Sequence, residues 1–224
     1  MTDFDFSENE VQRYARHIVL KEVGGTGQMK LKRGRVLIVG AGGLGSPLAM
    51  YLAAAGVGTI GIVDADTVEL SNLQRQIAHG MSDIGAPKVD SAKATMNDMN
   101  PEITVHAHNI RLDASNVMDL IGDYDVIADG SDNFETRFLL NDACYMAGKT
   151  LVSGAALRFD GQVSTFKAHQ GAPNPCYRCI YHAPPPADAI PSCAQGGVLG
   201  SVVGMIGGMQ ATEVLKELMG IGDG

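Results

Sequence analysis

The residues best suited to chemistry lie in polar or glycine-rich segments that follow predicted buried strands. The first segment follows residues 36–39 and fits the pattern G-x-G-x-x-G at Gly40, Gly42 and Gly45. Glycines allow a tight turn and let a phosphate approach the backbone, and a helix beginning there offers free N–H groups and its positive dipole end. The segment therefore predicts a nucleotide-binding site, and standing alone it favours NAD or FAD.

Charged and polar side chains follow the next predicted strands. Asp64 ends the strand predicted over 59–64, at the spacing where an acid usually binds a ribose hydroxyl. In open sheets of parallel strands, ligands bind beyond the carboxyl ends of the strands. The side chains that we expect to meet at this edge are Asp64, Asp66, Asn72, Arg75, Lys88, Asp132 and Asn133.

This set suits phosphate chemistry better than hydride transfer, which needs a nicotinamide pocket and usually a catalytic acid. The cations Arg75 and Lys88 would stabilise charge that develops on phosphoryl groups, and the carboxylate of Asp132 can bind Mg²⁺. We therefore expect nucleotidyl transfer from a triphosphate. An NAD(P)-dependent oxidoreductase is the first alternative.

The elements that must position these residues alternate between strand and helix over the first 150 residues, which predicts an α/β fold with a doubly wound, Rossmann-like, mostly parallel sheet. Helices are expected at 7–20, 28–32, 43–55, 87–99, 113–122, 134–147 and 198–219, with a loop at 24–27. Further strands are expected at 103–107, 124–129 and 150–152, followed by a turn at 153–156. Asp160-Gly161 is a hairpin signal that adds antiparallel strands toward the C-terminus. Residues 1–224 are expected to form a single domain.

Composition excludes several classes of protein. The net charge of −8 gives no electrostatic basis for binding nucleic acid or an anionic membrane. The uncharged stretch 196–211 is short for a membrane span, and the acidic N-terminus does not resemble a signal peptide. Four cysteines in 224 residues do not form a disulfide scaffold, so a cytoplasmic location is expected.

The motifs together resemble the MoeB/ThiF/HesA family of ubiquitin-activating-type adenylyltransferases. The matching segments are RYARHI (13–18), GAGGLG (40–45), DAD (64–66), SNLQRQ (71–76), GAPK (85–88), DGSDN (129–133), SGAA (153–156) and CAQGGV (193–198). The resemblance covers essentially the whole chain, and NLQRQ between Asp64 and Lys88 is its most specific part.

The resemblance implies ATP-dependent adenylation of the C-terminal glycine of a ubiquitin-like sulfur-carrier protein, similar to ThiS or MoaD, with release of pyrophosphate. It implies ATP and Mg²⁺ as ligands, and thiamine or molybdopterin biosynthesis as the pathway. The residues implied to contact ATP are Gly40, Gly42, Gly43, Gly45, Asp64, Asp66, Ser71, Asn72, Leu73, Gln74, Arg75, Lys88, Asp132 and Asn133. Arg75, Lys88 and Asp132 are implied to be catalytic, with Asp132 on Mg²⁺. Arg16 is implied to reach the phosphates of a neighbouring subunit, so a homodimer is expected.

The cysteines depart from the family pattern. Cys176 and Cys179 form half of a tetrahedral zinc site, but the chain holds no second pair, and Cys144 in a predicted helix is a poor substitute. Either a C-terminal tail is missing or the zinc site is lost. Cys193 precedes a helix N-terminus, where its thiol pKa can be lowered, and in some relatives the matching cysteine bonds to the carrier.

Several of the polar residues also have an interpretation in which they stabilise the fold rather than bind a ligand. Asp129 is a candidate structural acid, and Asp66 is a candidate support for its loop rather than an ATP contact. The histidines show no metal-ligand spacing, and His79, His106 and His108 are expected at the surface. A non-catalytic scaffold that binds a ubiquitin-like protein is the second alternative, and the sequence does not distinguish thiamine from molybdopterin carriers.

Overall fold

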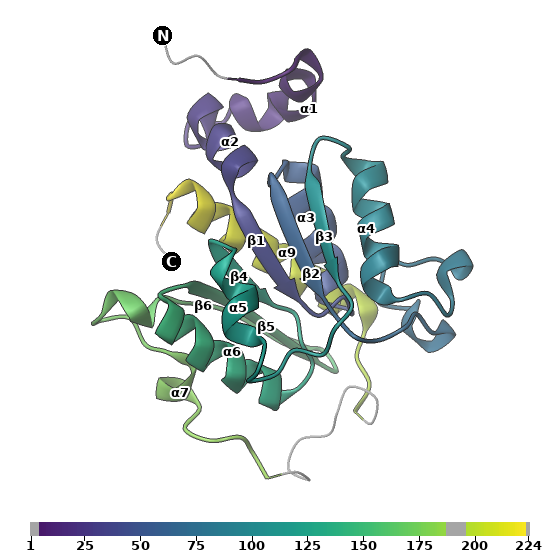
Figure 1. The fold of residues 1–224 in the computed structure, drawn as a ribbon, viewed down its shortest axis with the longest axis vertical. Coiled ribbons are helices and arrows are strands. Elements are labelled where there is room, and N and C mark those ends of the chain that lie inside the picture. Colours follow the sequence, from purple (N-terminus) through teal and green to yellow (C-terminus); the bar gives the residue numbers. More distant parts are fainter. Residues whose placement is uncertain (1–4, 187–195, 223–224) are drawn as a thin grey trace.

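The computed structural model describes residues 5–186 and 196–222, and within them the chain forms one six-stranded sheet (Figure 1). The strands are β1 (Arg35–Val39), β2 (Thr59–Val63), β3 (Thr104–His108), β4 (Val126–Asp129), β5 (Thr150–Leu157) and β6 (Asp160–Phe166). Their order is β3-β2-β1-β4-β5-β6, and every pairing is parallel except the antiparallel β5–β6 ladder. The predicted doubly wound sheet, with antiparallel pairing toward the C-terminus, is confirmed.

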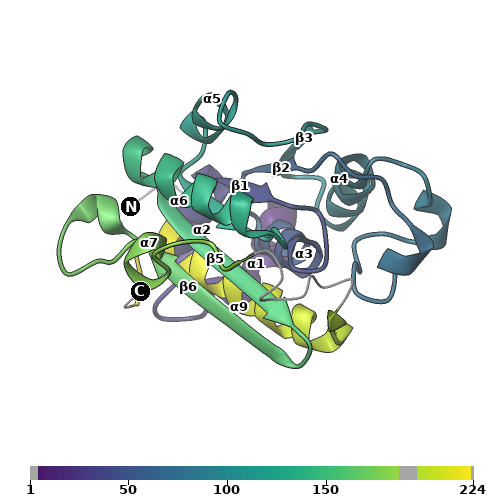
Figure 2. The ribbon, with the colours of Figure 1, turned by 90° about the horizontal axis from the view of Figure 1, so that it is seen from below.

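Helices cover both faces of the sheet, as Figure 2 shows. On one face α3 (Gly45–Ala55), α4 (Lys88–Met99) and α9 (Gly200–Met219) enclose a core with Val36 and Ile38 of β1. On the other face α5 (Val117–Gly122) and α6 (Phe134–Ala147) pack on Leu37 and Val39. β1 is therefore buried on both faces, which is why it reads as a continuous apolar run rather than an alternating one.

The sheet divides at β1, whose neighbours are β2 on one side and β4 on the other. The chain leaves these strands in opposite directions, so a crevice opens beyond their carboxyl ends. The turn after β1 runs so close to the loop after β4 that a Cβ on Gly40 would lie 2.9 Å from the carbonyl oxygen of Gly130. Gly40 also has φ of +95°, so this position requires glycine on two grounds.

The two N-terminal helices, α1 (Glu8–Ile18) and α2 (Gly24–Arg33), lie at the amino ends of the strands, beyond the end of β1 that is opposite its arrowhead (Figure 1). The predicted capping box of α1 is confirmed, with reciprocal hydrogen bonds between Ser7 and Glu10. Asn100, which follows α4, donates its amide to the Tyr14 hydroxyl at 2.8 Å and so attaches α1 to the main body.

Several predicted boundaries were wrong. Residues 24–27 begin α2 rather than forming a loop, because the missing side chain of Gly27 lets α2 lie against Met219 of α9. The turn expected at 153–156 is also wrong, since β5 continues to Leu157 along its ladder with β6. The hairpin turn is Arg158-Phe159, and Asp160-Gly161 is the start of β6.

The remaining short elements are η1 (Leu70–Asn72), η2 (Met81–Asp83), η3 (Ala168–Gln170) and α7 (Tyr177–Ile180). Within the described ranges, none of the helices combines the length and apolar character that crossing a bilayer requires.

The close approach of the two loops can be tested with a matched pair of substitutions. Gly40→Ala and Gly85→Ala place an alanine at φ values of +95° and +90°, but only the first meets a neighbouring atom. We expect Gly40→Ala to lower the free energy of unfolding by at least about 1 kcal/mol more than Gly85→Ala, because overpacking adds to backbone strain. Urea unfolding of both variants measures this difference, and equal losses would contradict the contact.

Candidate functional site

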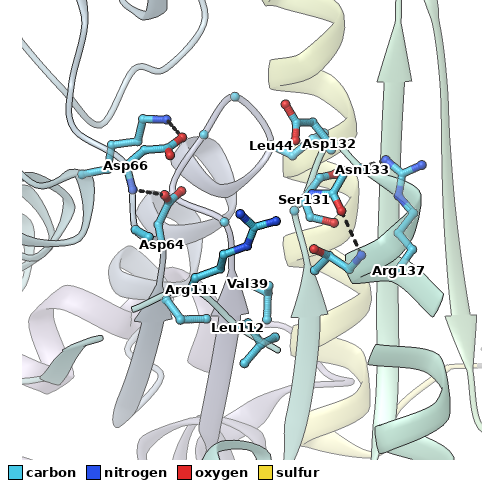
Figure 3. Close-up of a pocket in the computed structure, with 18 of the residues that line it drawn as sticks. Val39, Leu44, Asp64, Asp66, Arg111, Leu112, Ser131, Asp132, Asn133 and Arg137 are labelled. Atoms are coloured by element: carbon cyan, nitrogen blue, oxygen red, sulfur yellow. Dashed lines mark hydrogen bonds and ion pairs between the residues drawn. The ribbon is translucent and has the colours of Figure 1, made fainter. Parts of the chain in front are cut away.

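A cavity of about 630 Å³ opens beyond the carboxyl ends of β1, β2 and β4. Figure 3 shows Asp64 and Asp66 on one side of it and Asp132, Asn133 and Arg137 on the other. Both sides come from loops that leave neighbouring strands, so the cavity occupies the crevice that the strand order creates.

Most of the predicted nucleotide-binding residues line this cavity. They are Gly40, Gly42, Gly43, Asp64, Asp66, Asn72, Arg75, Lys88, Asp132 and Asn133. Gly45, Ser71, Leu73 and Gln74 do not line it. Gly45 packs instead, since a Cβ there would lie 1.8 Å from the carbonyl oxygen of Gly40.

The glycine turn is held by the acid that follows β2. Asp64 accepts hydrogen bonds from the backbone N–H groups of Ala41 and Asp66, both at 2.8 Å and each on a different carboxylate oxygen. The turn is thereby tied to the next loop, and the N–H of Ala41 is not available to a ligand. The N–H groups of Gly42 and Gly43 have no hydrogen-bond partner within the described part of the chain.

Two cations face the turn from the loop after β2 and from α4. Lys88 is 6% exposed, and its Nζ lies 2.8 Å from Oδ2 of Asp66, whose side chain is 71% exposed. Because the carboxylate is in solvent and the ammonium is buried, an anion in the cavity competes with Asp66 for Lys88. Arg75 is half-buried and donates to the carbonyl of Ser71 at 3.1 Å.

The loop after β4 presents Asp132 and Asn133. Asn133 caps α6, with its side-chain oxygen accepting from the N–H of Thr136 at 2.8 Å. Asp132 is exposed, and its carboxylate has no hydrogen-bond or ion-pair partner among the described residues. Its oxygens are therefore free to bind a cation.

The predicted structural role of Asp129 fits its surroundings at the base of this loop. Asp129 is fully buried and accepts from the hydroxyls of Ser131 at 2.6 Å and Ser153 at 2.8 Å. Nε of Arg137 lies 3.8 Å from its Oδ2. Burial raises the pKa of Asp129, and the positive charge of Arg137 opposes that rise. These contacts fix the loop that carries Asp132.

Several lining residues were missed by sequence reasoning. Arg111 and Leu112 follow β3 at the same edge of the sheet, and that position was the signal that could have found them. Arg137 was missed because it lies one turn inside α6. An apolar wall comes from residues distant in sequence, which no local pattern brings together: Leu44, Ala156, Val198 and Val203.

The surface assignment of the histidines was wrong for His79, which is 8% exposed. His79 lies behind the glycine turn and contacts the Ala41 carbonyl and the Ser91 hydroxyl. This cluster was not predicted, because a backbone carbonyl and a distant serine leave no local signal in the sequence. His106 is exposed, and His108 is half-buried with Nε2 3.0 Å from the Tyr124 hydroxyl.

The cysteine pair is close together. Sγ of Cys176 lies 3.6 Å from Sγ of Cys179, in the spacing of half a zinc site. No cluster of three or more metal-ligating side chains occurs among residues 5–186 and 196–222, so these residues do not complete a four-ligand zinc site. Cys144 is buried in α6, and burial raises its pKa to about 12. Cys193 lies outside the described residues.

The fold and the cavity define an α/β protein with a nucleotide-type site at the point where the sheet divides. A family model described as the ThiF family matches residues 14–224. The chain therefore belongs to the ThiF family, as its motifs predicted.

Named relatives agree with this assignment. The chain is 48% identical over 214 residues to "Adenylyltransferase and sulfurtransferase MOCS3" of Culex quinquefasciatus, covering 96% of this chain and 48% of that protein. It is 50% identical over 220 residues to "Probable adenylyltransferase/sulfurtransferase MoeZ" of Mycobacterium tuberculosis, covering 97% of this chain and 56% of that one. The chain thus spans about half the length of these curated relatives.

Solved structures support the fold. PaaA superimposes with a TM-score of 0.82 at 23% identity, over 100% of this chain and 69% of PaaA. MccB of E. coli, solved with ATP, superimposes with a TM-score of 0.78 at 22% identity, over 93% of this chain and 64% of MccB. At these identities the likeness concerns the fold alone.

The buried charge pair beneath the site yields a prediction. Arg137→Met should lower the free energy of unfolding by about 3 kcal/mol at neutral pH, because Asp129 would keep a buried charge without its cation. Arg111→Met is the matched control, since Arg111 also lines the cavity but its nearest ion-pair contact, Nη2 to Glu135 at 3.9 Å, is exposed. It should cost less than about 1 kcal/mol.

The pH dependence of that loss is a further check. As pH falls, Asp129 becomes protonated and no longer needs a cation, so the difference between wild type and Arg137→Met should shrink. Urea unfolding at several pH values measures it. A loss that stays constant with pH would show that Arg137 acts through packing and its hydrogen bond to the Ser131 carbonyl, and not through its charge.

Proposed function

We propose that this protein uses ATP to adenylate the C-terminal glycine carboxylate of a ubiquitin-like sulfur-carrier protein, releasing pyrophosphate. The observation that carries the proposal is the cavity in which Arg75, Lys88 and Asp132 surround a glycine turn. The Asp132 carboxylate and two N–H groups of that turn have no partner within the described residues. Two relatives whose names include adenylyltransferase share about half of the chain's residues.

In this reaction a carboxylate oxygen of the carrier attacks the α-phosphorus of ATP. A new P–O bond forms, the bond between the α-phosphorus and the bridging oxygen breaks, and pyrophosphate leaves with that electron pair. The nucleophile is already ionised, so no general base is required. The protein has to overcome repulsion between two anions, and it does so with cations and alignment.

Each part of the cavity has a role in this proposal. Asp64 binds the ribose, and the N–H groups of Gly42 and Gly43 approach the phosphates. Arg75 and Lys88 stabilise the charge that moves toward the leaving pyrophosphate. Asn72 and Asn133 contribute polar contacts at the edges of the cavity.

Asp132 is the residue that would hold Mg²⁺. Its free carboxylate fits this cation, which is usually bound by one or two carboxylates together with substrate phosphates rather than by a full protein cage. When bound, Mg²⁺ neutralises phosphate charge. Cys176 and Cys179 would supply two of the four ligands of a structural zinc ion.

An NAD(P)-dependent oxidoreductase is a weaker candidate, because two cations and an acid line the cavity and suit phosphate chemistry better than hydride transfer. A non-catalytic scaffold remains the second alternative. We propose a cytoplasmic location, and thiamine or molybdopterin biosynthesis as the pathway.

We further propose a homodimer with shared sites. Arg16 is exposed on α1, at the end of the sheet opposite the cavity, so it can reach phosphates only in a neighbouring subunit (Figure 1). Tyr51 of α3 lies over Gly208 of α9, beside Met205 and Met209, and these three large side chains are 57–62% exposed. Such an apolar surface favours contact with a second copy.

ATP–pyrophosphate exchange with Mg²⁺ tests the proposed reaction. Exchange should appear only when a carrier ending in Gly-Gly is present, because the carboxylate is the nucleophile. Asp132→Ala and Arg75→Ala should each abolish it, whereas Asp98→Ala, an exposed acid on α4, should leave it unchanged.

Three outcomes would count against parts of this account. Full exchange by Asp132→Ala or Arg75→Ala would remove that residue from its role. Carrier binding without exchange would identify the scaffold alternative. Comparison of ThiS-like and MoaD-like carriers in the same assay identifies the pathway.

Shared sites predict complementation between inactive variants. Arg16→Ala and Asp132→Ala should each be inactive alone. Mixed dimers contain one site with both residues intact, and about half of the dimers in an equal mixture are mixed, so mixing the two variants should restore about a quarter of the wild-type exchange rate. If Arg16 acts within its own subunit, mixing restores nothing.

A further inference from the structure

His79 is buried directly behind the glycine turn, although no step of the proposed reaction uses it. Its Nε2 lies 2.9 Å from the carbonyl oxygen of Ala41, the residue between Gly40 and Gly42. Its Nδ1 lies 2.8 Å from Oγ of Ser91 on α4. The imidazole therefore joins the turn to a helix that is 50 residues later in the chain.

The partners of His79 fix where its proton lies. A carbonyl oxygen only accepts, so Nε2 must carry the proton that it donates to Ala41. The Ser91 hydroxyl donates its one proton to Oδ2 of Asp83 at 3.0 Å, so its contact with Nδ1 does not assign the protonation of that nitrogen. Oδ2 of Asp83 also accepts from the N–H of Gly80 at 2.7 Å.

Burial of the ring favours its neutral form. Burial lowers the pKa of His79, and the charge of Lys88 acts in the same direction. The hydrogen bond to Ala41 and the charges of Asp83 and Asp64 oppose that change. In both protonation states Nε2 keeps its proton, so the bond to Ala41 persists.

This bond completes a clamp on one residue of the turn. The N–H of Ala41 donates to Asp64 at 2.8 Å, and its carbonyl accepts from His79 at 2.9 Å. Both polar groups of Ala41 are thus held. The next two residues of the turn, Gly42 and Gly43, line the cavity, and their N–H groups have no hydrogen-bond partner within the described residues.

We propose that His79 is a positioning residue for ATP, which it serves by fixing the Ala41 carbonyl and so the two N–H groups that receive the phosphates. This inference rests on the proposed function, because it assigns His79 to the same ATP site. It adds a residue that does not line the cavity.

Two substitutions at His79 separate positioning from packing. His79→Leu removes the hydrogen bond at similar volume, and His79→Gln keeps a side-chain N–H that can reach the Ala41 carbonyl. We expect His79→Leu to raise the Kd for a non-hydrolysable ATP analogue with Mg²⁺, measured by calorimetry, about tenfold, and His79→Gln to stay within about threefold of wild type. His106→Leu, at an exposed position of β3, is the matched control and should not change the Kd.

Steady-state kinetics should show that the substitution weakens the use of ATP and not that of the carrier. In the exchange assay His79→Leu should raise the KM for ATP and leave the KM for the carrier unchanged. Loss of folded enzyme would lower kcat without changing either KM. Wild-type affinity for the analogue in His79→Leu, or equal losses in the Leu and Gln variants, would overturn the inference.

Nitrogen NMR of labelled His79 provides a readout independent of activity and of the leucine variant. Wild type should show a proton on Nε2, and Ser91→Ala should show the same, because the Ala41 carbonyl accepts that proton in both. A wild-type ring protonated on Nδ1 and not on Nε2 would overturn the inference even if ATP binds. Failure of wild type to bind the analogue would instead overturn the proposed function.

Discussion

The candidate site depends on the close approach of two backbones at the carboxyl ends of β1 and β4. Gly40 and Gly130 leave no room for a side chain between them, and Gly45 packs against the carbonyl of Gly40 in the same way. This contact lets the turn after β1 bend into α3 immediately beyond the strand. It also brings the loop that carries Asp132 within reach of the same cavity as the turn.

The polar groups around the cavity form two sets: those engaged in internal hydrogen bonds, and those without a partner within the described residues. The Asp64 carboxylate, the buried Asp129 and the imidazole of His79 are each engaged by two or more hydrogen bonds. Asp132 and the N–H groups of Gly42 and Gly43 have no partner within the described residues. Groups without internal partners are those that a bound anion and its cation can use at no cost in internal hydrogen bonds. Internal hydrogen bonds therefore fix the backbone around the cavity, whereas Asp132 and these two N–H groups are available to a ligand. Lys88 and Arg75 would exchange the Asp66 carboxylate and the Ser71 carbonyl for a phosphate.

The predictions from sequence were accurate where the local backbone conformation requires a particular type of residue. The glycine turn, the capping box of α1 and the strand–helix alternation follow from backbone geometry and periodicity, and each is confirmed. They failed where packing between distant segments decided the outcome. Residues 24–27 are helical because α2 meets α9, and β5 runs past Ser153 because β6 pairs along it. The burial of His79 was not predicted, because its partners Ala41 and Ser91 are distant in the sequence and form no recognisable pattern with it.

The central claim is that the cavity binds a triphosphate rather than a dinucleotide. Calorimetry with Mg-ATP and with NAD⁺ on the same preparation tests it most directly. The account predicts saturable binding of Mg-ATP that weakens at least about tenfold in Lys88→Met, since a charge-assisted hydrogen bond to phosphate is lost, and no measurable binding of NAD⁺. Binding of NAD⁺ that is tighter than that of Mg-ATP would contradict the account.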